Sequence, residues 1–177
     1  WKFLIENFIE PYHVQFVHQK TTSQPLKDHY TIVDGMCYGS GVDLNKENAS
    51  SGNLSVSARY LSLFPNFIVG TYFPGQLGVY LNQPIGSGRT NQKRIIYTTE
   101  GHHLTKAEIK NQKNLWWQVH KEDHAICERL QLGRASPISI EGGLLSPYWE
   151  KSVRAFQKIV IKSIMKSSKI KKEKIYV

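Results

Sequence analysis

Residues 59–82 read RYLSLFPNFIVGTYFPGQLGVYLN, and they contain three short runs of β-branched and aromatic residues. The runs are residues 59–64, 67–73 and 77–82. Two or three residues separate them, and these include the dipeptides Pro65-Asn66 and Pro74-Gly75, which are typical of tight turns. Because turns this short join neighbouring strands that run in opposite directions, the stretch predicts an antiparallel sheet.

The predicted sheet extends on both sides of this stretch. Residues 30–33 and 36–38 form two further strands, which turn at the Asp-Gly pair of residues 34–35. Residues 93–99 form another strand, after the glycine-rich segment 86–88. That segment has neither the Lys-Ser/Thr of a phosphate-binding loop nor the longer dinucleotide-binding pattern, so we interpret it as a strand-connecting turn.

Two helices follow the strand-rich region. Thr105 and Glu108 have the spacing of a capping box, and the apolar periodicity that follows them ends at Gly133. A second helix is predicted to open with Ser146 as its N-cap and Pro147 at its first position. Strands followed by helices predict an α+β fold, in which the helices gather on one side of an antiparallel sheet.

The charge of the chain is concentrated at its C-terminus. The 177 residues carry a net charge of +9, of which residues 151–177 contribute +8 through nine basic side chains and one acid. A nucleic-acid-binding domain would spread its basic residues over one face, so this distribution argues against nucleic acid as a partner. We expect residues 1–165 to form one domain and residues 166–177 to form an exposed basic tail.

The composition is that of an ordinary globular protein, with 40% apolar and 21% charged residues. No run approaches the roughly 18 apolar residues of a membrane span, so we expect no membrane association. The two cysteines, Cys37 and Cys127, are too few for a disulfide framework, and a cytoplasmic location is therefore the expectation. Because the first residue is Trp1 rather than Met, we expect the chain to be part of a longer protein.

Two histidines near the N-terminus are candidate metal ligands. His13 and His18 lie five residues apart, and on a regular helix this spacing would turn their side chains about 140° from each other. They can therefore meet at one metal ion only if the helix is broken. Pro11 favours such a break, because proline cannot continue the hydrogen bonds of a helix interior.

A second histidine pair lies in the predicted helix after residue 105. His120 and His124 have the i, i+4 spacing of two zinc ligands on one helix face. The zinc-peptidase patterns, however, need a glutamate directly after the first histidine or directly before the second, where this chain has Lys121 and Asp123. A zinc hydrolase would also need a third ligand, which the sequence does not suggest.

A series of motifs runs in order along almost the whole chain. Its N-terminal part is Trp1-Lys2, Glu6-Asn7-Phe8, Glu10, Tyr12-His13 and His18. Its remaining part is Phe64-Pro65-Asn66, Trp117, Glu122-Asp123, Cys127-Glu128, Gln131, Gly133, Gly143, Ser146-Pro147, Glu150 and Phe156. Together these motifs resemble the catalytic domain of Rieske-type non-heme iron oxygenases, the large subunits of ring-hydroxylating oxygenases and their demethylase relatives.

The resemblance implies a mononuclear Fe(II) ion whose ligands are His13, His18 and Asp123. Two imidazoles and one carboxylate on one face of Fe(II) leave positions open for O₂. The resemblance also implies catalytic or orienting roles around the iron for Glu10, Asn7 and Tyr12. In this family the residue that matches Glu10 links the iron to a Rieske cluster on a neighbouring subunit.

The fold that the resemblance implies is a helix-grip (START/Bet v 1-like) fold. In this fold a curved antiparallel sheet packs against a long C-terminal helix, in agreement with the elements predicted above. A substrate cavity is then expected between the sheet and the helices. We expect its substrate-binding side chains to include Phe64, Phe67, Tyr72 and Tyr80.

The [2Fe-2S] Rieske cluster of the family has no site in this chain. Such a cluster is bound by two cysteines and two histidines, in Cys-x-His and Cys-x-x-His motifs. Neither Cys37 nor Cys127 has a histidine two or three residues after it. We expect the cluster in the parent protein, with a ferredoxin or a reductase as electron donor and with a homotrimeric assembly.

The resemblance implies an oxidoreductase, a monooxygenase or dioxygenase that uses O₂ to hydroxylate, or oxidatively dealkylate, a small organic substrate. The alternative is a non-catalytic helix-grip module that binds a hydrophobic ligand. It would need the sheet and the C-terminal helix but not the three iron ligands.

Overall fold

The structure is a computed structural model, which describes residues 1–175 except residues 23, 25, 44–56, 73–74 and 99–102. Its strands are β1 (His29–Asp34), β2 (Cys37–Asp43), β3 (Ser57–Leu63), β4 (Phe67–Tyr72), β5 (Gln76–Gly86) and β6 (Arg89–Thr98). Its α-helices are α1 (Lys2–Ile9), α2 (Tyr12–Val17), α3 (Lys106–Arg134) and α4 (Lys151–Ile175). Two short 3₁₀ helices are η1 (Leu26–Asp28) and η3 (Pro137–Glu141).

The six strands form one antiparallel sheet in the order β1-β2-β3-β4-β5-β6, so that each strand pairs with the next along the chain. The predicted strands are therefore confirmed, although residues 73 and 99 at two predicted ends lie outside the described residues. The first hairpin turns at Gly35, whose φ of +56° is a conformation that favours glycine. The last hairpin joins β5 to β6, where Gly86 pairs with Arg89.

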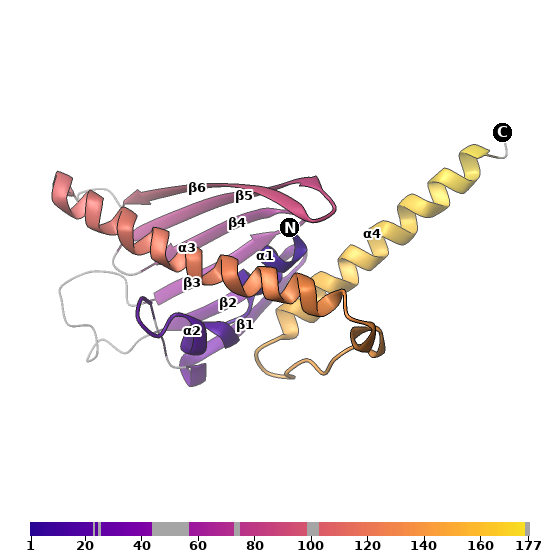
Figure 1. The fold of residues 1–177 in the computed structure, drawn as a ribbon, viewed down its shortest axis with the longest axis horizontal. Helices are drawn as coiled ribbons and strands as arrows, with labels where there is room; N and C mark the ends of the chain where they lie inside the picture. The colour runs from indigo at the N-terminus through magenta and orange to yellow at the C-terminus, as the bar shows by residue number, and fades with distance from the viewer. Residues whose placement is uncertain (23, 25, 44–56, 73–74, 99–102, 176–177) are drawn as a thin grey trace.

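The helices pack against different parts of the sheet, as Figure 1 shows. α1 packs against β2 and β3, and α3 crosses in front of the sheet from the β6 side to the N-terminal helices. The first turns of α4 pack on β1 and β2. The core lies at this junction, where the fully buried Ile5, Ile9 and Phe156 meet. This arrangement agrees with the predicted helix-grip fold.

The C-terminal helix begins later than the sequence predicts. Ser146 accepts hydrogen bonds from the backbone N–H groups of Tyr148 and Trp149, both at 3.3 Å, so it caps a turn rather than the helix. α4 itself begins at Lys151. Its first turns are held to α1 by the buried Ser152 hydroxyl, which donates to the carbonyl oxygen of Ile9 at 3.1 Å.

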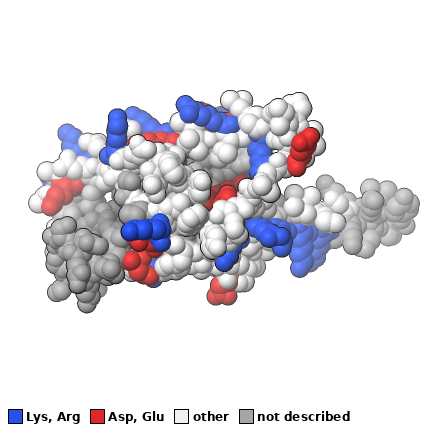
Figure 2. All heavy atoms as spheres, turned by 90° about the horizontal axis from the view of Figure 1, so that it is seen from below, with Lys and Arg blue, Asp and Glu red and all other residues white. Residues whose placement is uncertain are grey.

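The predicted basic tail is the continuation of α4 rather than a separate segment, because the helix extends to Ile175. Of the expected exposed tail, residues 166–168 are exposed, and the side chains of residues 169–177 lie outside the described part of the chain. Figure 2 shows basic and acidic side chains mixed over the body and basic ones gathered where α4 leaves it. Among the described residues, no helix has both the length and the hydropathy that a membrane span requires.

Candidate metal centre

The proline between α1 and α2 sets the position of the first histidine. A residue before proline is held in an extended conformation, and Glu10, with φ −102° and ψ 141°, ends α1 in this way. The Glu10 carboxylate thereby covers the start of α2 and accepts hydrogen bonds from the backbone N–H groups of Tyr12 and His13. Its other oxygen, Oε1, lies 2.7 Å from His13 Nδ1. The break predicted at Pro11 thus also gives His13 a carboxylate partner.

A second break brings His18 beside His13. α2 ends at Val17, and His18, with φ −94° and ψ 30°, has left the helical path. The two imidazole rings are therefore 5.1 Å apart between centroids, where a regular helix would have separated them. His18 is 3% exposed, and its Nδ1 lies 2.8 Å from Oε2 of Glu122 on α3.

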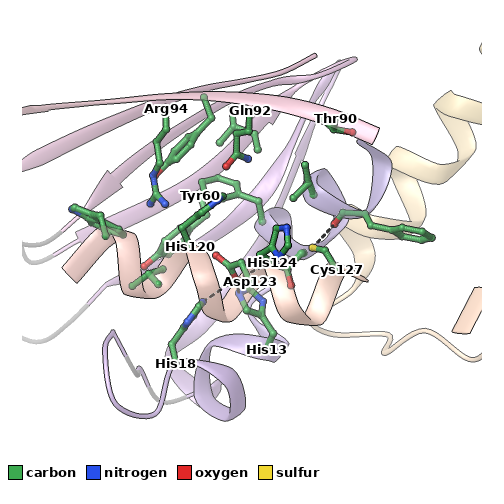
Figure 3. Close-up of a pocket in the computed structure, with 18 of the residues that line it drawn as sticks. His13, His18, Tyr60, Thr90, Gln92, Arg94, His120, Asp123, His124 and Cys127 are labelled. Carbon is green, nitrogen blue, oxygen red and sulfur yellow. Dashed lines mark hydrogen bonds and ion pairs between the residues drawn. The ribbon is translucent and has the colours of Figure 1, made fainter. Parts of the chain in front are cut away.

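α3 supplies the third side chain of the group. Oδ1 of Asp123 lies 3.6 Å from His13 Nε2 and 3.1 Å from His18 Nε2. Asn7 of α1 donates a hydrogen bond to the same oxygen at 2.9 Å. The ligand atoms of His13, His18 and Asp123 all lie within 4.8 Å of one another, and Figure 3 shows the three side chains pointing toward a common centre.

The hydrogen bonds around the two histidines select which ring nitrogen faces that centre. In both rings Nδ1 lies beside a carboxylate, Glu10 for His13 and Glu122 for His18, so Nδ1 carries the proton. Nε2 of each ring then points toward Asp123, at the position where a metal ion would take the place of a proton. A histidine whose other nitrogen donates to a carboxylate is the usual arrangement of a metal-bound imidazole.

The charges of the group suit a divalent cation. Burial raises the pKa of Asp123, but contacts with His18, His13 and Asn7 outweigh this effect and leave the pKa below its ordinary value. For His18, burial lowers the pKa, but the carboxylates of Asp123 and Glu122 outweigh this effect and raise the pKa above its ordinary value. Asp123 therefore stays a carboxylate. Two imidazoles and one carboxylate are a donor set that fits Fe(II).

His120 and His124 do not join this group. They lie on α3 with ring centroids 6.3 Å apart, and they line the same cavity as the three candidate ligands. Among the described residues, His13, His18 and Asp123 are the only set of three side chains placed to hold a metal ion together. The structure therefore offers no third ligand for the zinc site considered above.

A cavity of about 1270 Å³ opens above the candidate ligands, between α3 and the sheet. Tyr72 and Tyr80 line it as expected, and their hydroxyl groups are 2.7 Å apart. Opposite each other in the sheet, Gly70 and Gly78 make room for these rings, since a Cβ at either position would lie 2.4–2.6 Å from Tyr72. The shape of the cavity thus depends on glycine, which has no side chain, at both positions.

Phe64 and Phe67 lie elsewhere than expected, and Tyr12 contributes to the site through its backbone rather than its side chain. Phe64 packs into the core against Phe156, and neither Phe64 nor Phe67 lines the cavity. Phe67 is paired with the exposed Leu81 on the outer face of the sheet, since strand residues alternate between faces. The Tyr12 ring is 47% exposed and turned away from the centre, so only its backbone N–H takes part.

Several residues of the site were not predicted from the sequence. The sequence analysis assigned no role to Glu122, although it directly precedes Asp123. In the structure its carboxylate lies beside Nδ1 of His18. On β6, Thr90, Gln92 and Arg94 line the cavity, because every second residue of this strand faces inward. The sequence alone does not distinguish them, because residues 90–94 are all polar and only the strand register separates the inward from the outward side chains.

The comparisons with known proteins agree with this geometry. A family described as "Ring hydroxylating alpha subunit (catalytic domain)" matches residues 1–166. The chain belongs to this family. The catalytic domain is also 25% identical to choline monooxygenase, chloroplastic, of Amaranthus tricolor over 164 residues, which are 88% of this chain and 36% of that protein.

A solved structure shares the fold of this catalytic domain. It is the quaternary ammonium Rieske monooxygenase CntA in complex with an inhibitor, with a TM-score of 0.69 and 17% sequence identity. The alignment covers 92% of this chain and 45% of CntA. The catalytic domain therefore spans less than half the length of both relatives.

Proposed function

We propose that this chain is the catalytic domain of a Rieske-type oxygenase and binds mononuclear Fe(II) through His13, His18 and Asp123. The observation that carries the proposal is the pair of carboxylates behind the two histidines. Glu10 and Glu122 hold the Nδ1 atoms, and both Nε2 atoms consequently face the Asp123 oxygen. When bound, Fe(II) would supply the activation of O₂ for the insertion of oxygen into an organic substrate.

Each residue around the centre has a definable task in this proposal. Asp123 supplies the negative charge, and Asn7 holds its Oδ1 toward the histidines. Glu10 and Glu122 orient the imidazoles so that their Nε2 atoms face the metal position. The cavity leaves space for a small organic substrate beside the centre.

Glu10 is proposed to have a second task in the parent protein. Its two oxygens already accept three bonds within the chain, but a carboxylate has about four acceptor sites, so one further donor can bind. That donor would be a histidine ligand of a Rieske cluster on the neighbouring subunit of a homotrimer. A Glu10→Gln variant of the full-length parent, loaded with excess Fe(II), should lose product formation per bound iron by orders of magnitude, far more than any weakening of iron binding explains. Near-normal turnover with both metal centres filled would refute this task.

The parent protein supplies the other components in this proposal. They are the [2Fe-2S] cluster, a ferredoxin or reductase, O₂ and the organic substrate, and the product is hydroxylated or dealkylated. Choline and quaternary ammonium compounds appear in the names of the two relatives, which are monooxygenases. We further propose a cytoplasmic location, which is supported by the free thiols of Cys37 and Cys127.

Iron binding tests the proposal directly. The purified chain, reconstituted with Fe(II) under anaerobic conditions, should hold about one iron per chain. His13→Ala should abolish this binding, whereas His124→Ala, a histidine of the same cavity outside the candidate group, should leave it unchanged. Equal iron retention by the two variants would refute the ligand set.

The alternative, a module that binds a hydrophobic ligand without metal, is favoured only by the size of the cavity. It predicts no iron in the wild-type chain, so the same measurement separates the two functions.

A further inference from the structure

The inner face of β6 gives the cavity one polar wall. Thr90, Gln92 and Arg94 alternate with exposed residues along this strand and line the cavity. In Figure 3 they extend from the sheet toward α3, on the opposite side of the cavity from Asp123. A polar wall facing a metal centre can fix one end of a substrate while the other end lies near the metal ion.

Arg94 is the charged member of this wall, and it lacks an acidic partner. None of the ion pairs among the described residues includes it. Its Nε is buried without a hydrogen-bond partner, one of three such side-chain atoms in the described part of the chain and the one that belongs to a charged group. Arg94 as a whole is half-buried. Because a buried polar atom without a partner is costly, the Nε atom points to a ligand that completes its hydrogen bonding.

The guanidinium is held in place by two aromatic rings. It lies 4.3 Å from the ring centroid of Tyr80 and 4.7 Å from that of Trp116. Both rings are themselves fixed, since Tyr80 meets the Tyr72 hydroxyl and the Trp116 indole N–H donates to Gln76 at 2.7 Å. Arg94 is therefore pre-organised, and its planar edge of N–H donors suits a planar anion.

His120 lies beside this cation on α3. Burial lowers its pKa, and the positive charge of Arg94 lowers it further, so His120 is neutral. A neutral imidazole can donate a hydrogen bond without adding charge. The Arg94 end of the cavity thus offers one fixed positive charge and a neutral donor beside it.

We propose that the cavity binds a carboxylate-bearing organic substrate, whose carboxylate pairs with the guanidinium of Arg94. Two parallel N–H···O bonds from an arginine to a carboxylate are short and charge-assisted. The aromatic walls would hold the apolar part of the substrate, and its far end would face the candidate iron centre. The identification of the ligand as a substrate rests on the proposed oxygenase function.

The same geometry disfavours a substrate whose only charge is a quaternary ammonium group. Such groups bind over the free faces of aromatic rings. Here Arg94 already covers faces of Tyr80 and Trp116, and its positive charge would repel a second cation. This chain should therefore differ in its preference from a site built for choline alone.

Calorimetry with three probes of similar shape tests the proposal. They are phenylacetate, phenylacetamide and benzyltrimethylammonium, titrated into the iron-free chain so that no metal ion can bind the carboxylate. We expect phenylacetate to bind at least tenfold more tightly than either other probe. Arg94→Gln should remove this preference, and Lys93→Gln, which deletes an exposed cation of the same strand, should preserve it.

Equal binding of phenylacetate and phenylacetamide, tighter binding of the ammonium probe, or no phenylacetate binding at about 10 mM would overturn the proposal. The comparison of probes on the wild-type chain holds even if Arg94→Gln fails to fold. Iron content, measured on the same preparations, separates the two proposals. Iron binding without carboxylate preference refutes the substrate class alone, and carboxylate preference without iron binding refutes the oxygenase centre alone.

Discussion

Replacing Glu122 with glutamine should weaken iron binding although Glu122 is not a candidate ligand. Glu122 Oε2 lies 2.8 Å from His18 Nδ1 and accepts a second bond from the Thr21 hydroxyl at 2.8 Å. Glutamine keeps the shape and one acceptor oxygen but loses the negative charge. The His18 ring would then be a poorer donor of electron density to the metal ion and would be held less firmly.

The size of the effect follows from the burial of this pair. The His18 side chain is 4% exposed and that of Glu122 is 17% exposed, so the bond is only partly screened by water. Loss of a carboxylate behind a metal-bound histidine typically weakens metal binding by about 10- to 100-fold. This corresponds to about 1.4–2.8 kcal/mol. Glu122→Gln should lie near the lower end, and Glu122→Ala, which also removes the acceptor, near the upper end.

The assay is an anaerobic Fe(II) titration against a chelator of known affinity. Glu128→Gln is the matched control, because Glu128 lies on the same helix, is exposed, and forms its ion pair with His124, at 3.6 Å, away from the candidate ligands. The melting temperature of each iron-free variant shows whether the fold is intact. If Glu122→Gln and Glu122→Ala both bind Fe(II) as tightly as the control, then the histidine is not oriented through Glu122, and our reasoning about this centre is wrong.

Three further predictions concern packing and reactivity. Gly78→Val should lower the free energy of unfolding in urea by about 1–3 kcal/mol, because a Cβ there would lie 2.6 Å from a tyrosine ring; an unchanged value would contradict the packing. Ser152→Ala should cost about 1 kcal/mol in the same measurement, since it removes the buried bond to Ile9; no loss would refute this. At pH 8, iodoacetamide should label Cys37 before Cys127 in a mass-spectrometric time course. Burial raises the pKa of Cys127 to about 12, which leaves a thiolate fraction of about 10⁻⁴; the reverse order of labelling would refute this.

The fold could be predicted largely from local signals. Turn dipeptides and runs of β-branched residues identified the strands, and the capping box at Thr105 is present as expected. The start of α4 was misplaced because Ser146 and Pro147 satisfy the same pattern in a turn as in a helix. Local patterns therefore identify elements better than they identify element ends.

The site was predicted less completely, and for a different reason. His13 and His18 are close in sequence, so their meeting required only a broken helix. The approach of Asp123 depends on the whole fold, and only the resemblance to a family suggested it. Phe67 lies away from the cavity position predicted for it, because a shift of one residue moves a strand side chain to the other face of the sheet. Arg94 was not predicted because the strand register could not be read from the sequence.

The position of the candidate ligands along the chain has a consequence for biosynthesis. The ribosome produces both histidines early, but about 105 more residues, including all six strands, must follow before Asp123 exists. At typical rates of about 5–20 residues per second, this interval lasts roughly 5–20 s. During it the nascent chain holds two imidazoles without their carboxylate, and it cannot trap iron in the finished geometry. If the candidate centre binds iron as proposed, metal loading then follows the synthesis of Asp123, and iron is kept away from an unfinished polypeptide.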